Sequence, residues 1–395
     1  MRMEWTPEQD RLRHEYEELA RSTVALRAAE CYQAGTLDHH SWETLTECGF
    51  WRLAVPAKYG GAGTSYWDFV AALEGLASGA GDLGFLLSVI AHSGTLRGLV
   101  EFGTDCQRRR HLEPLMAKAI ASTAITEASG GSDVARIRTG AVAVANGYAI
   151  TGQKCHITNA PIADIALLLA RVAGLGRRDI TIFVIERTTP GIEMGPPEPM
   201  LGNRTSPTGS ITLQNAVIAA DEILGSIGNG LEPMYSVISH DRVLYGIVAA
   251  AFIDPLVDQV LRFVEQRQAF RSPIAEHQYV QGRVTDLVIL RDTIRWVSYG
   301  ALGRLLTGHP EASASCSVAK LAACEGLCQA TQHVMAIFGH IGYMAGPISR
   351  AAADALGTRI AGGTAEMQRK NIFHQVVGRP AKAQEATCHT GFAQT

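Results

Sequence analysis

Hydrophobic positions along the chain change their spacing twice, which divides the sequence into three blocks. Over residues 1–117 apolar residues recur every three or four positions, as on one face of an α-helix. Over 118–228 the period falls to two, which is typical of strands, and over 229–380 it returns to 3.6. We therefore expect an α+β, mainly helical protein with a helical domain, a central β domain and a helical bundle. The polar residues 381–395 predict a flexible tail.

Short-range signals predict where the first helices begin. The segment 6–9, Thr-Pro-Glu-Gln, has the pattern of an N-cap followed by a first-turn proline. Ser41 is a second candidate N-cap. The glycines of 59–63 lack the Gly-Lys-Ser/Thr ending of a phosphate-binding loop, so we interpret this segment as a turn between helices.

The central and C-terminal blocks carry equally clear signals. Asn146-Gly147 between strand-forming residues predicts a β-hairpin, and further strands are expected at 165–171, 179–186 and 210–215. A long helix is expected from Asp241 to Phe270, with Pro255 kinking or interrupting it. The apolar segments 281–307 and 312–337 predict two more long helices, packed in a bundle or against another subunit.

Composition narrows the classes of function. The 395 residues have a formal net charge of −3, which disfavours nucleic acid as the main partner. Apolar residues make up 47% and charged residues 18%, so disorder is excluded and contact between subunits is favoured. The N-terminus lacks the apolar core of a signal peptide, and no apolar run suggests a membrane span, so we expect a cytoplasmic protein. The cysteines are scattered, and we interpret Cys324 and Cys328 as buried hydrophobes and predict no metal site.

Three separated groups of motifs carry the specific information. The first is 124–133, Ala-Ile-Thr-Glu-Ala-Ser-Gly-Gly-Ser-Asp, followed by 151–160; the second consists of 241–242, 267–270 and 277–278; the third is 362–369, Gly-Gly-Thr-Ala-Glu-Met-Gln-Arg. In this order they resemble the acyl-CoA dehydrogenase family over essentially the whole chain. The resemblance implies an N-terminal helical domain, a central β-barrel or sandwich and a C-terminal four-helix bundle. It also implies bound FAD and a homotetramer or homodimer.

The resemblance assigns the cofactor contacts residue by residue. Those of the flavin ring are Ile125, Thr126, Ser132, His156, Ile157 and Thr158. The family binds the dinucleotide part of FAD mainly through a neighbouring subunit. The residues assigned to this part are Arg267, Phe270, Gln278, Gly339, Thr364 and Glu366. An arginine suits phosphate oxygens because its guanidinium is a fixed cation with several donors. His156 is a departure, because the family commonly has an aromatic residue, often Trp, at this position.

The family's reaction removes the α-proton of an acyl thioester with a carboxylate while the β-hydride moves to the flavin. Many members carry this carboxylate where the present chain has Gly362, whose backbone N–H can still hydrogen-bond the thioester oxygen. Other members carry it on the long helix directly before an arginine, which corresponds here to Asp241-Arg242. We therefore expect Asp241 to be the catalytic base, with an Asp in place of the usual Glu. The alternative interpretation is that Asp241 only caps a helix that begins near Arg242.

Further residues are assigned to the substrate. Ser132, Ser239 and Arg242 are expected to contact it, and Ser239 stands where some relatives have an Asp that contacts pantetheine. His240 is expected to contact the substrate tail or to lie on the surface. The resemblance thus implies an oxidoreductase that converts an acyl-CoA, or an acyl group on a carrier protein, to the 2-enoyl thioester. A flavin-dependent monooxygenase of the same fold is the alternative, and a flavin-free scaffold is a third class.

The remaining expectations concern partners and pathway. The resemblance makes an electron-transfer flavoprotein a candidate acceptor, although His156 changes the neighbourhood that such a partner would meet. The strong bias toward arginine over lysine hints at a GC-rich bacterial genome, and with it at a biosynthetic role beside a catabolic one. The acyl group itself is not readable from the sequence.

Overall fold

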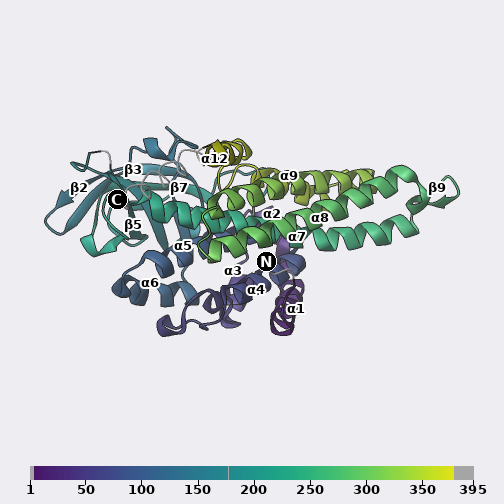
Figure 1. Cartoon of the computed structure of the whole chain (residues 1–395), viewed down its shortest axis with the longest axis horizontal. Helices are drawn as coiled ribbons and strands as arrows, with labels where there is room; N and C mark the ends of the chain where they lie inside the picture. The colour runs from purple at the N-terminus through teal and green to yellow at the C-terminus, as the bar shows by residue number, and fades with distance from the viewer. Residues whose placement is uncertain (1–3, 177, 378–395) are drawn as a thin grey trace, which may run out of the picture.

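A computed structural model of the whole chain describes residues 4–176 and 178–377. It has three parts: N-terminal helices, a β domain and an elongated helical bundle that projects away from both (Figure 1). The order of the three blocks confirms the prediction from hydrophobic spacing. The tail expected over 381–395 lies outside the described residues.

The N-terminal domain consists of helices connected by short loops. Thr6 caps the first helix and forms a capping box with Gln9, which confirms the predicted start. The second predicted cap is wrong: α3 begins at His39, and Asp38 caps it by accepting a hydrogen bond from the backbone N–H of Ser41. The elements are α1 (Pro7–Ser22), α2 (Val24–Ala34), α3 (His39–Glu47), η1 (Phe50–Ala54), η2 (Ala57–Tyr59), α4 (Tyr66–Ala80), α5 (Leu83–Phe102) and α6 (Asp105–Ala117).

The β domain contains one mixed sheet of eight strands in the order β6-β7-β3-β2-β4-β5-β8, with β1 paired to β4. The predicted hairpin is confirmed, because β2 and β3 meet across Ala145 and Asn146, with Val144 opposite Gly147. The elements are β1 (Ala121–Ala124), η3 (Val134–Arg136), β2 (Gly140–Val144), β3 (Gly147–Thr158), η4 (Ala160–Ile162), β4 (Ile165–Val172), β5 (Ile180–Glu186), β6 (Ile192–Met194), β7 (Thr208–Ile218), η5 (Ala220–Glu222) and β8 (Ile223–Leu224).

Strand β4 joins the β domain to the helices because both of its faces are buried. Leu167 and Leu169 pack into the large core shared with the helical domains. Ala166 and Leu168, which point to the other face, belong to a separate core inside the β domain. The strand sequence therefore reads as a continuous apolar run rather than as an alternation.

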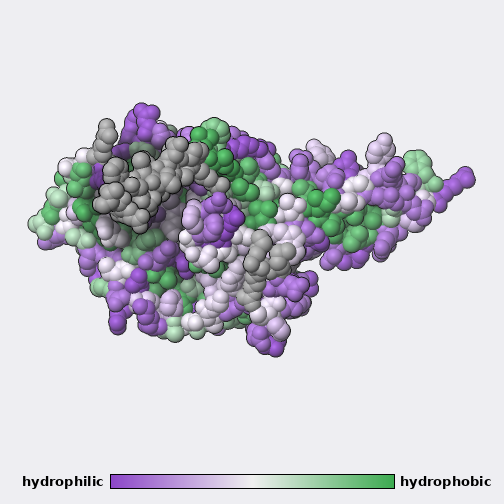
Figure 2. All heavy atoms as spheres, in the orientation of Figure 1, coloured by the Kyte–Doolittle hydropathy of each residue, from purple (hydrophilic) through white to green (hydrophobic). Residues whose placement is uncertain are grey.

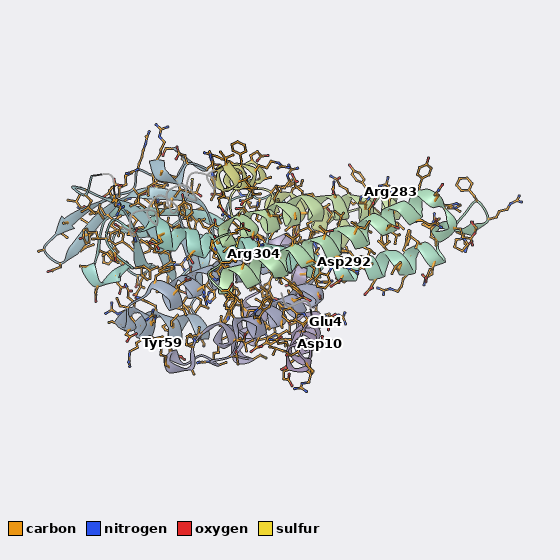
Figure 3. The ribbon with its side chains drawn as sticks, in the orientation of Figure 1. Glu4, Asp10, Tyr59, Arg283, Asp292 and Arg304 are labelled. Carbon is orange, nitrogen blue, oxygen red and sulfur yellow. The ribbon has the colours of Figure 1, made fainter. Side chains whose placement is uncertain are left out.

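Three long helices form most of the bundle, and the three shorter ones that follow them in the chain pack against α9. Arg283, Asp292 and Arg304 follow α8 from the β9–β10 ribbon toward the β domain (Figure 3). The elements are α7 (Leu231–Gln266), β9 (Gln268–Ala269), β10 (Ser272–Pro273), η6 (Ile274–Glu276), α8 (Gln278–Leu306), α9 (Ala312–Phe338), α10 (His340–Tyr343), α11 (Pro347–Thr358) and α12 (Ala365–Val377). The helices predicted at 281–307 and 312–337 correspond to α8 and α9.

Of the two effects expected of Pro255, a kink or an interruption, the interruption is wrong, since α7 runs for 36 residues through it. A proline cannot donate to the carbonyl four residues earlier, which here is Ala251. That carbonyl accepts a hydrogen bond from Ser78 Oγ of α4 at 3.3 Å. The packing of α4 against α7 thus supplies the missing donor.

Helices α5 and α7 are the central helices of the molecule. By length and composition both could cross a membrane, but 78% and 72% of their most apolar windows are buried inside the protein. The two helices approach each other closely where Gly94 lies against Asp241 and where Gly98 lies against Val237. They therefore run antiparallel. Asp241, the candidate base, lies at the contact between these two helices.

Candidate active site

Asp241 lies well inside α7, which begins ten residues earlier at Leu231. The interpretation of Asp241 as a helix cap is therefore wrong, and its side chain is free for another role. Its carboxyl packs against α5 at Gly94, where a Cβ would lie 2.4 Å from Asp241 Oδ1. Any larger residue at this position would require the carboxyl group to shift.

The environment of Asp241 changes its acidity. Among the residues that the structure describes, buried Oδ1 has no hydrogen-bond partner. Loss of water around the carboxyl raises its pKa to about 8, and the neighbouring charge of Arg242 opposes this only in part. A carboxyl with a pKa near the working pH can take up a proton and release it again. Such a perturbed acid in a buried position is typical of a catalytic group.

The loop at Gly362 and Gly363 lies between α11 and α12, and its carbonyls are held by three side chains. Arg242 Nε donates to Gly362 O at 3.3 Å, and Lys320 Nζ donates to Gly363 O at 2.8 Å. Gln368 Nε2 lies within hydrogen-bond distance of both carbonyl oxygens, at 3.2 and 2.9 Å. The loop is thus fixed from the bundle side, close to Asp241.

Lys320 and Gln368 were missed by the sequence reasoning. Lys320 is fully buried in α9, where loss of water lowers the pKa of its ammonium group. A buried lysine needs a strong acceptor, which the Gly363 carbonyl provides. The one sign of this role in the sequence is a single lysine in an Ala-rich helix. That sign is weak, because a lysine in such a helix is ordinarily exposed to solvent.

Tyr245 lies one helical turn after Asp241 and so shares its face of α7. Its ring carbon Cε2 lies 3.2 Å from the place that a Cβ on Gly362 would occupy. Behind this ring is a narrow cavity with about 20 Å³ of space for water-sized molecules. Its lining is mostly apolar and includes Leu83, Leu87, Ile90, Val248 and Leu327.

On the β-domain side, the structure brings the first motif group together. The backbone N–H of Cys155 donates to Thr126 O at 2.9 Å, which places the segment after β1 beside the end of β3. Ile125, Thr126 and Thr158 are half-buried, and Ile157 is buried. Two threonine hydroxyls with neighbouring apolar side chains can contact a planar ring and hydrogen-bond its edge.

A buried ion pair locks these two segments together. Lys154 Nζ donates to Glu127 Oε1 at 2.8 Å and to Ile125 O at 3.1 Å. Burial alone would raise the pKa of Glu127, but Lys154 and the hydrogen bonds from Thr139 and the backbone lower it to about 2. Glu127 and Lys154, conspicuous in the motif, therefore hold together the two segments that carry Ile125, Thr126, Ile157 and Thr158.

His156 and Ser132 are both exposed. His156 has a left-handed backbone with φ of 55°, at a register shift between β3 and β7. Its Nδ1 lies 2.8 Å from Glu198 Oε2, and its backbone N–H donates to Glu198 Oε1. Glu198, which the sequence did not single out, thus fixes the orientation of the imidazole.

Ser239, His240 and Arg242 take different directions from the same turn of α7. Ser239 is buried and its Oγ donates to Tyr235 O at 2.7 Å, within the helix. His240 is also buried, edge-on against Tyr66, so its expected surface position is wrong. Burial and the charge of Arg97 lower the pKa of His240 to about 4, which keeps the imidazole neutral.

The residues expected at the dinucleotide divide into two groups. Thr364 lies at the start of α12, where its Oγ1 accepts from the backbone N–H of Met367 at 3.3 Å, and Glu366 is exposed beside it. The other group is at the far end of the bundle, beside the β9–β10 ribbon (Figure 1). This group consists of Arg267, Phe270, Gln278 and Gly339. A single chain does not bring the two groups together.

The turn at the tip of the ribbon is unusual. Phe270 and Arg271 connect β9 to β10 with φ of 51° and 73°, although neither is a glycine or an asparagine. The Phe270 side chain is 93% exposed. A two-residue hairpin turn of this type needs left-handed backbone at both positions, and it costs free energy at residues other than glycine or asparagine.

Comparison with protein families covers the three blocks in turn. The models of the acyl-CoA dehydrogenase N-terminal, middle and C-terminal domains match residues 6–119, 122–216 and 228–377. The chain belongs to the acyl-CoA dehydrogenase family. Within this family it is an FAD-dependent oxidoreductase that acts on CH–CH bonds of acyl thioesters.

Individual relatives agree with this assignment. The chain is 28% identical over 382 residues to an acyl-CoA dehydrogenase of Bacillus subtilis, covering 95% of this chain and 100% of the relative. It is 29% identical over 371 residues to cyclohexane-1-carbonyl-CoA dehydrogenase of Geobacter metallireducens, covering 92% and 95%.

Two solved structures show the same architecture. The prolyl acyl carrier protein oxidase AnaB superposes with a TM-score of 0.89 at 26% identity, covering 94% of this chain and 100% of AnaB. Butyryl-CoA dehydrogenase from Megasphaera elsdenii gives a TM-score of 0.88 at 26% identity, covering 95% and 100%.

The residues present fit FAD. Thr126 and Thr158 offer short hydroxyls beside apolar Ile157, which suits the polar edge and flat face of a flavin. At the ribbon, exposed Phe270 suits an aromatic base, and exposed Arg267 suits a diphosphate. Within the described parts of the chain, no group of three or more His, Cys, Asp or Glu side chains is arranged to hold a metal ion.

Proposed function

We propose that Asp241 is the base that removes the α-proton of an acyl thioester and that the product is the 2-enoyl thioester. The observation that carries this proposal is the Asp241 carboxyl itself, with an unpartnered buried oxygen and a pKa of about 8. No acid occupies position 362, and Asp241 is the carboxyl that lies against α5 close to the glycine loop.

The glycine loop supplies the second half of the proposed chemistry. When the α-proton leaves, negative charge develops on the thioester oxygen, and a fixed N–H donor lowers the energy of that state. We assign this donor to the backbone N–H of Gly362. Arg242, Lys320 and Gln368 hold the loop carbonyls, so the donor needs no rearrangement when the charge develops.

FAD, when bound, accepts the β-hydride. In our proposal Ile125, Thr126, Ile157 and Thr158 hold the ring, with His156 and Ser132 at its exposed side. Arg267, Phe270, Gln278 and Gly339 of a second subunit hold the dinucleotide part, together with Thr364 and Glu366. The separation of the two groups along one chain supports a site shared between subunits (Figure 1).

The surface also supports a homo-oligomer, which we propose to be a tetramer or a dimer. Hydrophobic patches extend along the bundle (Figure 2). Several large apolar side chains of the C-terminal helices and their loops are exposed, namely Ile341, Tyr343, Met344, Ile360, Phe373, Val376 and Val377. Apolar surface of this extent is typical of subunit contacts.

The substrate and acceptor are proposed at a coarser level. Similarity to a prolyl acyl carrier protein oxidase and to acyl-CoA dehydrogenases supports a thioester of CoA or of a carrier protein. Ser132 and Arg242 are our candidates for contacts near the thioester. Ser239 remains a candidate only if its hydroxyl turns away from Tyr235 O. We also propose a cytoplasmic location and an electron-transfer flavoprotein as acceptor.

The decisive experiment uses Asp241→Asn, which keeps the shape of the side chain but removes the base. We expect the variant to retain FAD and its 450 nm band, and to lose anaerobic bleaching with a panel of CoA and carrier-protein thioesters. Ser236→Ala, five residues earlier on the same helix, is the matched control and should bleach normally. Bleaching of the Asn variant at the wild-type rate would remove Asp241 from the mechanism. Oxygenated product from the wild type in air would favour the monooxygenase.

A further inference from the structure

We propose that Tyr245 limits the length of the acyl chain, so that the natural substrate is a short acyl thioester. The inference rests on the proposed function, which places the substrate α-carbon between Asp241 and the Gly362 loop. Tyr245 shares the helix face of Asp241, and a Cβ on Gly362 would lie 3.2 Å from its ring carbon Cε2. An acyl chain that extends beyond the β-carbon toward α5 therefore meets the phenol ring.

The space behind Tyr245 supports this role. The cavity there is lined mainly by apolar side chains of α5, α7 and α9, with Asn203 and Thr358 as its polar members, which suits hydrocarbon rather than a charged group. Its free space of about 20 Å³ accommodates roughly one or two waters, far less than a long alkyl chain needs. Tyr245 itself lines this cavity, so its ring is the barrier between the thioester position and the apolar interior.

The surroundings of the Tyr245 ring also favour its present position. Burial strongly raises the pKa of the Tyr245 hydroxyl, with a further contribution from the charge of Asp241, so the phenol remains neutral. Around the cavity, Val248 and Ala249 lie on the following turn of α7, and Leu83 and Leu87 face them from α5. Replacing the ring with a smaller side chain would join the cavity to the substrate position.

The test compares wild type, Tyr245→Val and Tyr245→Ala, each loaded with FAD. Butyryl, hexanoyl and octanoyl thioesters of CoA are mixed with each protein anaerobically, and kcat/KM for flavin bleaching is measured. Wild type should lose rate from butyryl to octanoyl. In the variants each added methylene that is fully buried in the cavity should raise kcat/KM roughly fourfold, so burial of two methylenes should give octanoyl a gain on the order of tenfold relative to butyryl.

Tyr235→Val is the matched control, because Tyr235 lies on the same helix and is 54% exposed, away from the cavity. It should keep the wild-type chain-length profile. Binding without chemistry gives a second readout: calorimetry with S-butyl and S-octyl pantetheine should show tighter binding of the octyl compound to Tyr245→Val only.

The outcomes separate the two proposals. An unchanged chain-length profile in folded, FAD-containing variants that still bleach with butyryl-CoA would overturn the role of Tyr245 and leave Asp241 as base. Efficient reaction of wild type with octanoyl-CoA would overturn it as well. Absence of bleaching by wild type with every thioester would instead remove the proposed function, and this inference with it.

Discussion

Gly94 is expected to be essential for proton abstraction although it carries no functional group. A Cβ added to Gly94 would lie 2.4 Å from Asp241 Oδ1 and 3.1 Å from its carboxyl carbon. Ordinary van der Waals contact begins at about 3.4 Å, so the carboxyl must move by about 1 Å. Displacement of a catalytic group by about 1 Å can cost on the order of 100-fold in rate.

The perturbation is therefore Gly94→Ala, and the expected result is a fall of about 100-fold in the first-order rate of anaerobic flavin bleaching at saturating substrate. The FAD content and the thermal unfolding midpoint report separately on folding. Both are expected to change little, because alanine is a better helix former than glycine and opposes the cost of the shifted carboxyl.

Gly98→Ala is the matched control one turn further along α5. A Cβ there would lie 3.0 Å from side-chain carbons of Leu167 and Val237, so it crowds the helix pair without touching Asp241. We expect this variant to bleach within a few-fold of wild type. If Gly94→Ala also bleaches at that rate while holding FAD, the carboxyl has room to move and the reasoning from the 2.4 Å contact is refuted.

Three further predictions concern the acidity of the base, the buried ion pair and the ribbon. A folded-state pKa of about 8 leaves Asp241 mostly protonated at pH 7. We therefore expect kcat/KM to rise about tenfold per pH unit below pH 8 and to level off above it. A profile that is flat from pH 6 to 9 would contradict the raised pKa. Lys154→Met leaves Glu127 charged and without its ion-pair partner, so the free energy of unfolding measured in urea should fall by about 3–5 kcal/mol. Adding Glu127→Gln to the same chain should partly restore it. Arg267→Ala should weaken FAD binding about 10- to 100-fold in fluorescence titration, whereas Arg262→Ala on the same helix should not; equal affinities would exclude the ribbon from the cofactor site.

The three-part fold was predictable from the sequence because the spacing of apolar residues follows directly from helix and strand geometry. The hairpin at Asn146-Gly147 was predictable for a local reason, because that dipeptide favours one type of hairpin turn. The continuity of α7 through Pro255 was not predictable, because the Ala251 carbonyl finds its donor in Ser78, which lies 173 residues before Ala251 in sequence.

The candidate site was predictable only where residue type and motif coincide. Asp241 and Gly362 belong to the motifs, and the structure places the Gly362 loop beside the turn of α7 that carries Asp241. The roles proposed for Gly94 and Tyr245 rest on shape and contact, and neither residue belongs to one of the three motif groups. Glu198 orients His156 across 42 residues of chain, a relation that only the folded backbone reveals.

The hydrogen bond from Ser78 to the Ala251 carbonyl has a consequence for how sequences of this kind can diverge. Proline at 255 leaves that carbonyl without its helical donor and Ser78 of α4 supplies one, so positions 78 and 255 are linked although they lie in different domains. A chimera that takes its N-terminal domain from a relative with alanine at 78 would bury an unsatisfied carbonyl in its central helix. Replacing Pro255 with alanine in the same chimera restores the helical donor, which makes the two substitutions compensatory.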